Sequence, residues 1–531
     1  MAELDLAAVL QSQQTTIESL NQTIQSMQKQ HAEEIKRLEI IIKGLNETID
    51  VLKKKIYGSS SEKSNAEQLS GQLDLFNELG IYLEELEQAV TQDVKGHTRI
   101  RKPKTVREEI LKDLPVVEVV HELEGEDRNC PYCNTPMTEL GREVVREEIK
   151  VIPARLQRIQ HIRVIYSCEL CKEDDTPTIV KAQVPPGLLK HSLASSSAVA
   201  YIMTQKYAYA QPLYRQEKSW EQLGMKLSRA TQANWINYCA MEYLRPVYDR
   251  LHEKLLERGV IHADETPCQV LKEQGKKPQN KSYMWLYRSG EDGLAPIILY
   301  DYQPTRGGYH AEEFLKGFEG FLHCDGFSGY NRLKNVTRCG CWAHLRRYFY
   351  DAIPAGSGSM TSPASKGYNF CTDLFHIEKQ LKELSPEDRK VKRLELETPV
   401  LKAFWSWLDT LEPLGGSRLA KAVTYAKNQR KYMETYLLDG RCSISNNAAE
   451  RSIRPYTVGR KNFLFHDTTK GAQASAIIYS LVECARANNL NISKYLETLL
   501  DHRLDYQNEP AILDNLMPWS ERIQTECKGP E

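Results

Sequence analysis

The chain has 531 residues, with 70 Lys and Arg against 71 Asp and Glu, which gives a net charge of −1. This length is too great for one hydrophobic core, so about three or four domains are expected in a multidomain α/β protein. The balanced charge excludes a globally basic coat for nucleic acid, and any contact with phosphates must come from local basic patches. Without a run of about 18 apolar residues or a secretory leader, no membrane partner and a cytoplasmic location are expected.

Residues 1–60 carry a heptad pattern. Ile at one seam position and Leu at the other is typical of parallel dimers; the repeating residues are Ile35, Leu38, Ile42, Leu45, Ile49, Leu52 and Ile56. We expect a coiled-coil helix that forms a homodimer or higher oligomer, the alternative being one amphipathic helix folded onto its own domain. Residues 61–120 are predicted to be a linker with a basic arm, which either touches DNA or is solvated.

Two CxxC pairs lie in residues 121–185. They consist of Cys130, Cys133, Cys168 and Cys171. Two-residue spacing lets both sulfurs of a pair face one ion, and four thiolates close a tetrahedral site. The segment is therefore predicted to be a zinc ribbon with a structural Zn²⁺, the alternative being four unrelated thiols.

Residues 186–258 are predicted to be a helical DNA-binding or pre-core region, and residues 259–480 a catalytic domain. In the latter, RGVIHADETPCQV is expected to form a strand that ends at Asp264 and Glu265 and turns at Thr266 and Pro267. A hairpin follows, then a strand carrying Asp325, then a short strand entering a basic helix. This order predicts a ribonuclease-H-like core, whose adjacent first and fourth strands would bring Asp264 and Asp325 together. Either acid could instead serve only a turn.

The motif SNNAAERSIRPYTVGRKNFLF, residues 445–465, places Glu450 among basic residues. The intervening residues, about 355–440, are expected to be a helical insertion, and residues 481–531 a helical C-terminal tail. An acid inside a basic segment suggests a metal ligand beside a polyanion, and three such acids suit two-metal phosphoryl transfer on nucleic acid with Mg²⁺ or Mn²⁺. The alternative for Glu450 is a capping box with Asn447.

Motifs along nearly the whole chain resemble the insertion-sequence-66 family of bacterial DDE transposases. They are KKKIYGSSSEKS, CPYC, CELC, HADET, HCDGFSGY, GCWAH and SNNAAERSIRPYTVGRKNFLF. The resemblance implies Asp264, Asp325 and Glu450 as the catalytic, metal-binding triad. It also implies double-stranded DNA of element ends and target as partner, with small proteins of the same element as possible accessories.

Two groups of residues are left with open roles. Cys341 and His344 are similar to a Cys-x-x-His signature of several transposase groups. With Cys339 nearby, a second metal site is one interpretation, and a buried thiol with a DNA-facing His344 is the other. Phosphate contacts are expected from the cations near the acids, unless they form a solvated helix face; these are Arg346, Arg347, Arg451, Arg454, Arg460 and Lys461.

The predicted function is that of a DNA transposase that cleaves the ends of an insertion element and transfers the strands into target DNA. The alternatives are a coiled-coil, zinc-ribbon DNA-binding protein without chemistry, or a hydrolytic nuclease with the same core.

Overall fold

A computed structural model describes residues 155–167, 179–354 and 361–529, two short strands, β1 (Thr91–Val94) and β2 (His97–Ile100), and a few isolated positions before residue 145. The chain divides into two compact units, residues 1–144 and 145–531. Most of the predicted coiled coil and linker, and all four cysteines of the predicted zinc ribbon, lie outside the described residues. The account below therefore concerns the second unit, which begins with the hairpin β3 (Ile165–Ser167) and β4 (Ile179–Lys181).

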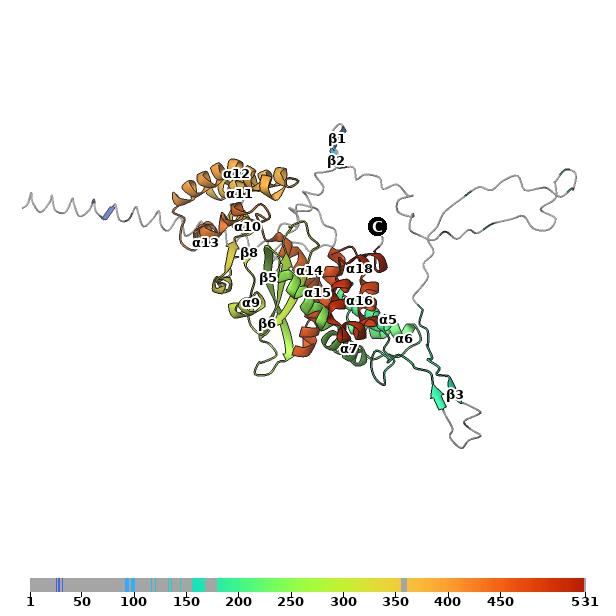
Figure 1. Cartoon of the computed structure of the whole chain (residues 1–531). Helices are drawn as coiled ribbons and strands as arrows, with labels where there is room; N and C mark the ends of the chain where they lie inside the picture. Colours follow the sequence, from blue (N-terminus) through green and yellow to red (C-terminus); the bar gives the residue numbers. More distant parts are fainter. Residues whose placement is uncertain are drawn as a thin grey trace, which may run out of the picture. The chain divides into compact units, whose positions relative to one another are not determined.

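A mixed sheet organises this unit (Figure 1). Its strand order is β7 (Ile298–Gln303), β6 (Lys281–Ser289), β5 (Val260–Lys272), β8 (Gly320–His323) and β9 (Val336–Cys339). β5, β6 and β7 pair antiparallel, whereas β5, β8 and β9 pair parallel. The first and fourth strands in the sequence are therefore neighbours. A short strand, β10 (His466–Thr468), pairs with the far end of β5.

The prediction of a turn at Thr266 and Pro267 is wrong, because β5 continues through both residues to Lys272. β8 pairs with β5 only as far as His262, and β10 joins only from Val270. Between those points β5 has β6 as its neighbour in the sheet. A proline, which lacks a backbone N–H, is tolerated where one side of a strand carries no ladder.

Helices cover both faces and one edge of this sheet. Trp285 and Tyr287 of β6 share a face and contact Tyr330 of η4 (Ser328–Arg332) and Phe314 of α9 (Gly308–Phe314), respectively. At the β7 edge, two backbone N–H groups donate to side chains of α15 (Thr469–Ala487): Ile298 to Cys484 at 3.2 Å and Tyr300 to Ser480 at 2.7 Å. α15 thereby covers an edge that would otherwise be open to pairing with another chain.

The helices before and after the sheet pack into the same core. The earlier ones are α5 (Ser196–Tyr207), α6 (Leu213–Gln222), α7 (Arg229–Tyr238), η3 (Cys239–Leu244) and α8 (Arg245–Leu256). The later ones are α16 (Ile492–Asp501), α17 (Arg503–Asn508), η6 (Pro510–Leu516) and α18 (Glu521–Glu526). One apolar cluster joins Val199, Leu251, Trp285 and Leu496, so residues 186–258 and the described tail share the core of the sheet rather than forming cores of their own.

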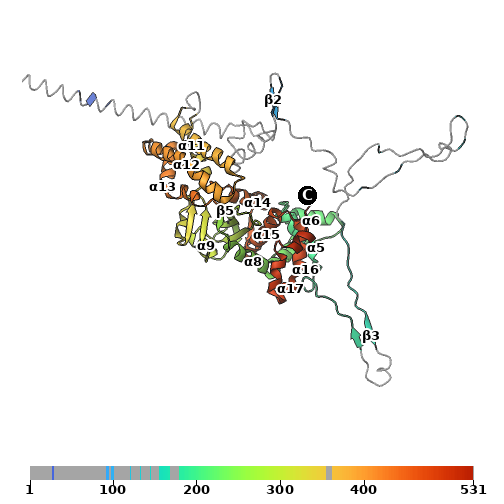
Figure 2. The same cartoon turned by 45° about the horizontal axis from the view of Figure 1, so that its top comes forward.

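The described part of the segment between β9 and Glu450 is mostly helical, as the sequence predicts for residues of about 355–440. After α10 (Trp342–Asp351) come α11 (Pro363–Leu381), α12 (Pro386–Asp409), α13 (Arg418–Met433) and η5 (Thr435–Leu438). α11, α12 and α13 each begin after a serine whose hydroxyl accepts the backbone N–H three residues on, which satisfies a free donor of the first turn. The helices of this insertion pack around a second apolar cluster, separate from the one described above, at the β9 edge of the sheet. The helices α15–α18 lie toward the opposite edge (Figures 1 and 2).

Within the described part of the chain, no helix is both long and apolar enough to cross a membrane.

Arg393 of α12 ties the insertion to the segment that leads to Glu450. It is fully buried, pairs with Glu378 of α11, and donates to the carbonyls of Tyr436, Asp439 and Cys442. Removing one partner of a buried ion pair leaves the other charge uncompensated.

We therefore expect Arg393→Ala to lower the free energy of unfolding by about 3–5 kcal/mol, measured by chemical denaturation. The matched control is Lys392→Ala on the same helix, whose ion pair with Glu395 is half exposed and worth less than about 1 kcal/mol. Equal losses in the two variants would contradict the role of Arg393.

Candidate active site

Asp264 and Asp325 both lie just beyond the end of the short ladder between β5 and β8. His262 of β5 pairs with His323 of β8 in parallel, and each aspartate follows its histidine by two residues. Burial and the negative charges of Glu265, Asp325 and Glu450 raise the pKa of Asp264 well above its ordinary value. Asp325 and Glu450 thus lie near enough to Asp264 for their charges to act on its carboxyl group.

The loop carrying Asp325 is held by Glu265, a residue to which the sequence analysis assigned no role. The Glu265 side chain is almost completely buried. Its carboxylate accepts hydrogen bonds from the Tyr330 hydroxyl at 2.6 Å and from Arg306 Nε at 2.7 Å. Asp325 Oδ1 accepts a hydrogen bond from the Phe327 N–H at 2.9 Å. Asp325 therefore forms the turn that the sequence analysis considered as its alternative role, in addition to lying near Asp264. A Cβ at Gly326 would lie 2.7 Å from the Tyr425 ring, so glycine lets this turn approach α13.

Glu450 lies in the first turn of α14 (Asn447–Phe463), and Asn446 attaches the start of that helix to the sheet. The buried Asn446 amide donates to the Ala263 carbonyl at 2.8 Å, and its oxygen lies 3.0 Å from His262 Nδ1. Its backbone N–H donates to Cys341 Sγ at 3.2 Å. The capping box considered for Asn447 and Glu450 is wrong, because Asn446 is the cap residue and its side chain bonds β5 instead.

Glu450 has two basic neighbours on α10. His344 Nε2 lies 3.5 Å and Arg347 Nη2 3.8 Å from its carboxylate oxygens. Burial disfavours a charged imidazole, but the interactions of His344 with Cys341, Glu450 and Asp325 outweigh this effect and raise the pKa of His344 to about 10. Ligand atoms of Cys341, His344 and Glu450 all lie within 4.8 Å of one another, whereas Cys339 belongs to a different cluster.

The other predicted DNA-contacting cations divide into two groups. Arg451 and Lys461 of α14 are exposed, Arg454 is half-buried, and Arg460 donates to the Thr266 hydroxyl at 3.1 Å. Arg346 instead packs over the rings of Tyr368 and Phe375 and donates to the Tyr368 hydroxyl at 3.0 Å. The structure therefore gives Arg346 a packing role between α10 and α11.

Comparison with known proteins identifies the class to which this fold and site belong. Residues 191–474 match the model described as Transposase IS66 family. Residues 127–172, which include the four paired cysteines, match the zinc-finger binding domain of transposase IS66, and residues 44–119 match Transposase C of IS166 homeodomain.

The chain belongs to the IS66 transposase family, which confirms the resemblance found in the sequence. Family membership supports a transposase role with DNA binding and a structural Zn²⁺ in the finger domain. Two uncharacterized proteins of Sinorhizobium fredii are similar along most of their length. The protein y4qI is 28% identical over 527 residues, covering 92% of each chain, and y4jD is 26% identical over 513 residues, covering 93% of this chain and 97% of its own.

The contacts of Asn446 predict a measurable loss when they are removed. Asn446→Ala is expected to lower the free energy of unfolding by about 1–3 kcal/mol, because the His262 ring and the Ala263 carbonyl lose a buried partner. Denaturant titration of Asn447→Ala, one residue further along, provides the control and should show a smaller change. If the two variants lost the same stability, the attachment of α14 through Asn446 would be disproved.

Proposed function

We propose that this chain cleaves DNA at the ends of an insertion element and joins those ends to target DNA, with Asp264, Asp325 and Glu450 as the catalytic carboxylates. The observation that carries the proposal is their convergence from β5, the loop after β8 and the first turn of α14. The strand order β7-β6-β5-β8-β9, with the first three strands antiparallel and the last two added in parallel, supports a ribonuclease-H-like core.

The donor atoms of the three acids fit divalent cations. Carboxylate oxygens are the ligands that Mg²⁺ and Mn²⁺ prefer. Burial and the neighbouring negative charges raise the pKa of Asp264, and a bound cation would offset both effects by favouring the charged carboxylate. When bound, a pair of such ions supplies activation of the attacking hydroxyl and stabilisation of the leaving oxygen during in-line displacement.

The protein's own residues prepare this site. Asn446 fixes the start of α14 against β5, and Glu265 holds the loop that carries Asp325, so the acids are positioned before DNA arrives. His344 and Arg347 place positive charge beside Glu450, where a DNA phosphate is expected. In the first reaction water cleaves a phosphodiester and leaves a 3′-hydroxyl. In the second, that hydroxyl attacks a target phosphodiester, so one such bond forms as another breaks.

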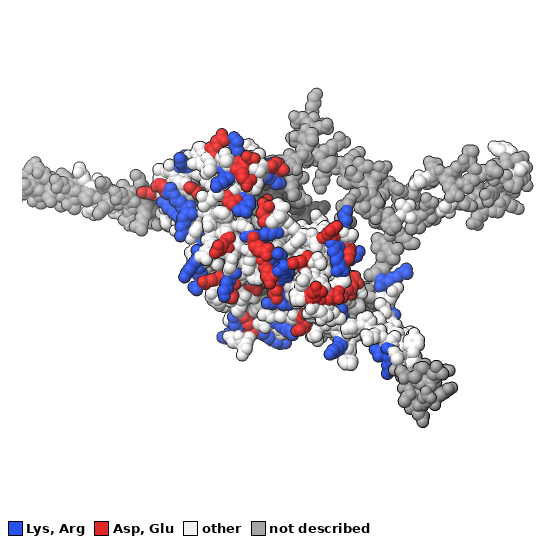
Figure 3. All heavy atoms as spheres, viewed as in Figure 1, with Lys and Arg blue, Asp and Glu red and all other residues white. Residues whose placement is uncertain are grey.

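The remaining parts of the chain have proposed roles around this reaction. Basic and acidic side chains are interspersed over the face of the second unit shown in Figure 3, so phosphate contacts depend on local groups such as α14. We propose that residues 1–60 assemble a homodimer or higher oligomer on two element ends, and that residues 186–258 and the zinc finger contribute to DNA binding.

Neutral replacements of the acids should separate chemistry from binding. We expect Asp264→Asn, Asp325→Asn and Glu450→Gln each to reduce end cleavage and strand transfer by about 10²–10³-fold or more, measured with labelled element-end DNA in Mg²⁺ or Mn²⁺. Glu312→Gln, which changes an exposed acid paired with Arg332, is the control and should retain both activities.

DNA binding by the same variants decides between the remaining interpretations. Retained binding without cleavage supports the proposal, and cleavage without joining in the wild type would indicate a hydrolytic nuclease. Specific binding with no chemistry in any variant would indicate a DNA-binding protein.

Variants of the two groups of cations should differ in the salt dependence of their DNA binding. Arg451→Ala should weaken DNA binding for all sequences and reduce the slope of log K against log salt by about 1, because one phosphate contact is lost. Arg346→Ala should leave this slope unchanged and lower the thermal midpoint instead, because its guanidinium packs on Tyr368 and Phe375. Fluorescence anisotropy over a salt series measures the slopes, and an equal reduction in both variants would refute the distinction.

A further inference from the structure

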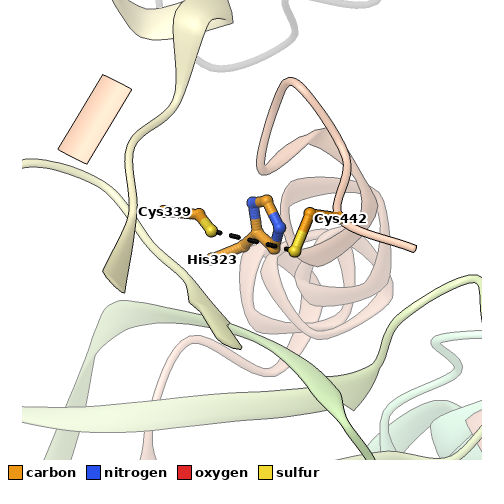
Figure 4. Close-up of side chains that lie close together, drawn as sticks. All are labelled: His323, Cys339 and Cys442. Carbon is orange, nitrogen blue, oxygen red and sulfur yellow. Dashed lines mark hydrogen bonds between the residues drawn. The ribbon is translucent and has the colours of Figure 1, made fainter. Parts of the chain in front are cut away.

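A second cluster of metal-ligating side chains is buried beside the carboxylate site (Figure 4). His323 and Cys339 are partners in the parallel register of β8 and β9, so their side chains lie together. Cys442 joins them from the segment between η5 and α14. The ligand atoms of the three residues all lie within 4.8 Å of one another, and the two sulfurs are 4.0 Å apart.

The Cys339 thiol donates to Cys442 Sγ at 4.0 Å, but the imidazole of the cluster is incompletely hydrogen-bonded. All three side chains have no solvent exposure. His323 Nδ1 is buried and has no hydrogen-bond partner among the described residues, and Nε2 receives only the Ser443 N–H at 3.3 Å. A buried polar atom without a partner costs about 1–3 kcal/mol, so a native protein is expected to satisfy it.

We propose that His323, Cys339 and Cys442 bind a thiophilic divalent cation, with Zn²⁺ as the best match. Two thiolates and an imidazole would supply three of the four ligands of a tetrahedral zinc ion, at about 2.3 Å from sulfur and about 2.0–2.1 Å from nitrogen, with a fourth position left for a small ligand. Tetrahedral ligands at those lengths stand about 3.5–3.8 Å apart. The observed separation of the sulfurs therefore needs only a small adjustment.

The charge balance suits a buried site. Binding releases the two thiol protons to solvent, and two thiolates with a neutral imidazole exactly cancel the charge of the ion. A neutral complex avoids the large cost of an uncompensated charge in the protein interior. The ring has two ways to bind. Binding through Nδ1 satisfies the orphaned atom and moves the ring proton to Nε2, which gives up the long contact with the Ser443 N–H. Binding through Nε2 replaces that contact and leaves the Nδ1 proton without a partner.

The contacts of Cys341 show that this cluster is separate from the site around Glu450. Cys341 lies only two residues after Cys339, but its sulfur accepts the Asn446 N–H and lies with His344 and Glu450. An ion at His323, Cys339 and Cys442 would join the ends of β8 and β9 to the segment that leads into α14. Asp325 follows His323 by two residues, and Asn446 follows Cys442 by four, so the ion would have a structural role that fastens both sides of the carboxylate site.

Zinc content of the full-length protein tests the proposal directly. Elemental analysis is expected to give about two zinc ions per chain, one in the finger and one in the cluster. The content should fall to about one in Cys339→Ser and in Cys442→Ser. Cys371→Ser, which changes another fully buried cysteine in the same apolar cluster, is the matched control and should retain two.

A second measurement keeps the test valid if a cluster variant fails to fold. In the full chain with Cys168→Ser and Cys171→Ser, the finger is disabled and the cluster is intact. Co²⁺ added to this protein should give thiolate charge-transfer absorption, which disappears when Cys442→Ser is also introduced. One zinc per wild-type chain with no cobalt absorption in the finger variant would overturn the proposal. So would mass mapping that found Cys339 and Cys442 joined as a disulfide in the protein as purified.

Discussion

The parallel pairing of β5 with β8 is the constraint on which the rest of this unit depends. Parallel neighbours cannot be joined by a tight turn, so the chain first adds β6 and β7 on one side of β5 and returns through α9. Only three residues of each strand pair, from Val260 to His262 on β5. This short ladder ends just before both aspartates, which places them together where β8 stops and β5 continues without it.

The helical insertion lies between the second and third acids in the sequence, and its fold must return the chain to the sheet. Asp325 and Glu450 are separated by 125 positions in the sequence (450 − 325). The insertion has its own apolar cluster, and Arg393 binds three carbonyls of the segment that returns from it to the sheet. Asn446 then attaches the start of α14 to β5. The buried guanidinium of Arg393 and the buried amide of Asn446, each with several hydrogen-bond partners, thus determine where Glu450 lies.

The proposed activity and the proposed zinc cluster use different ligand chemistry within a few residues of each other. Oxygen donors from Asp264, Asp325 and Glu450 suit hard cations, and the sulfurs of Cys339 and Cys442 suit soft ones. The division arises where β9 ends and α10 begins, because Cys339 remains paired in the sheet while Cys341 lies beyond it as the cap residue of α10.

Local pattern in the sequence indicated the order of the strands, the helices of the insertion and the family, and it singled out three acids as candidates, because strand and helix periodicity and motif spacing are properties of short segments. The tertiary structure decided what depends on neighbours distant in the chain. Pro267 remains within β5 because of which strands flank it, and Asn446 bonds β5 rather than its own helix. The sequence alone could not bring together Cys339 and Cys442, which are 103 residues apart, because that contact exists only once the insertion has folded and returned to the sheet.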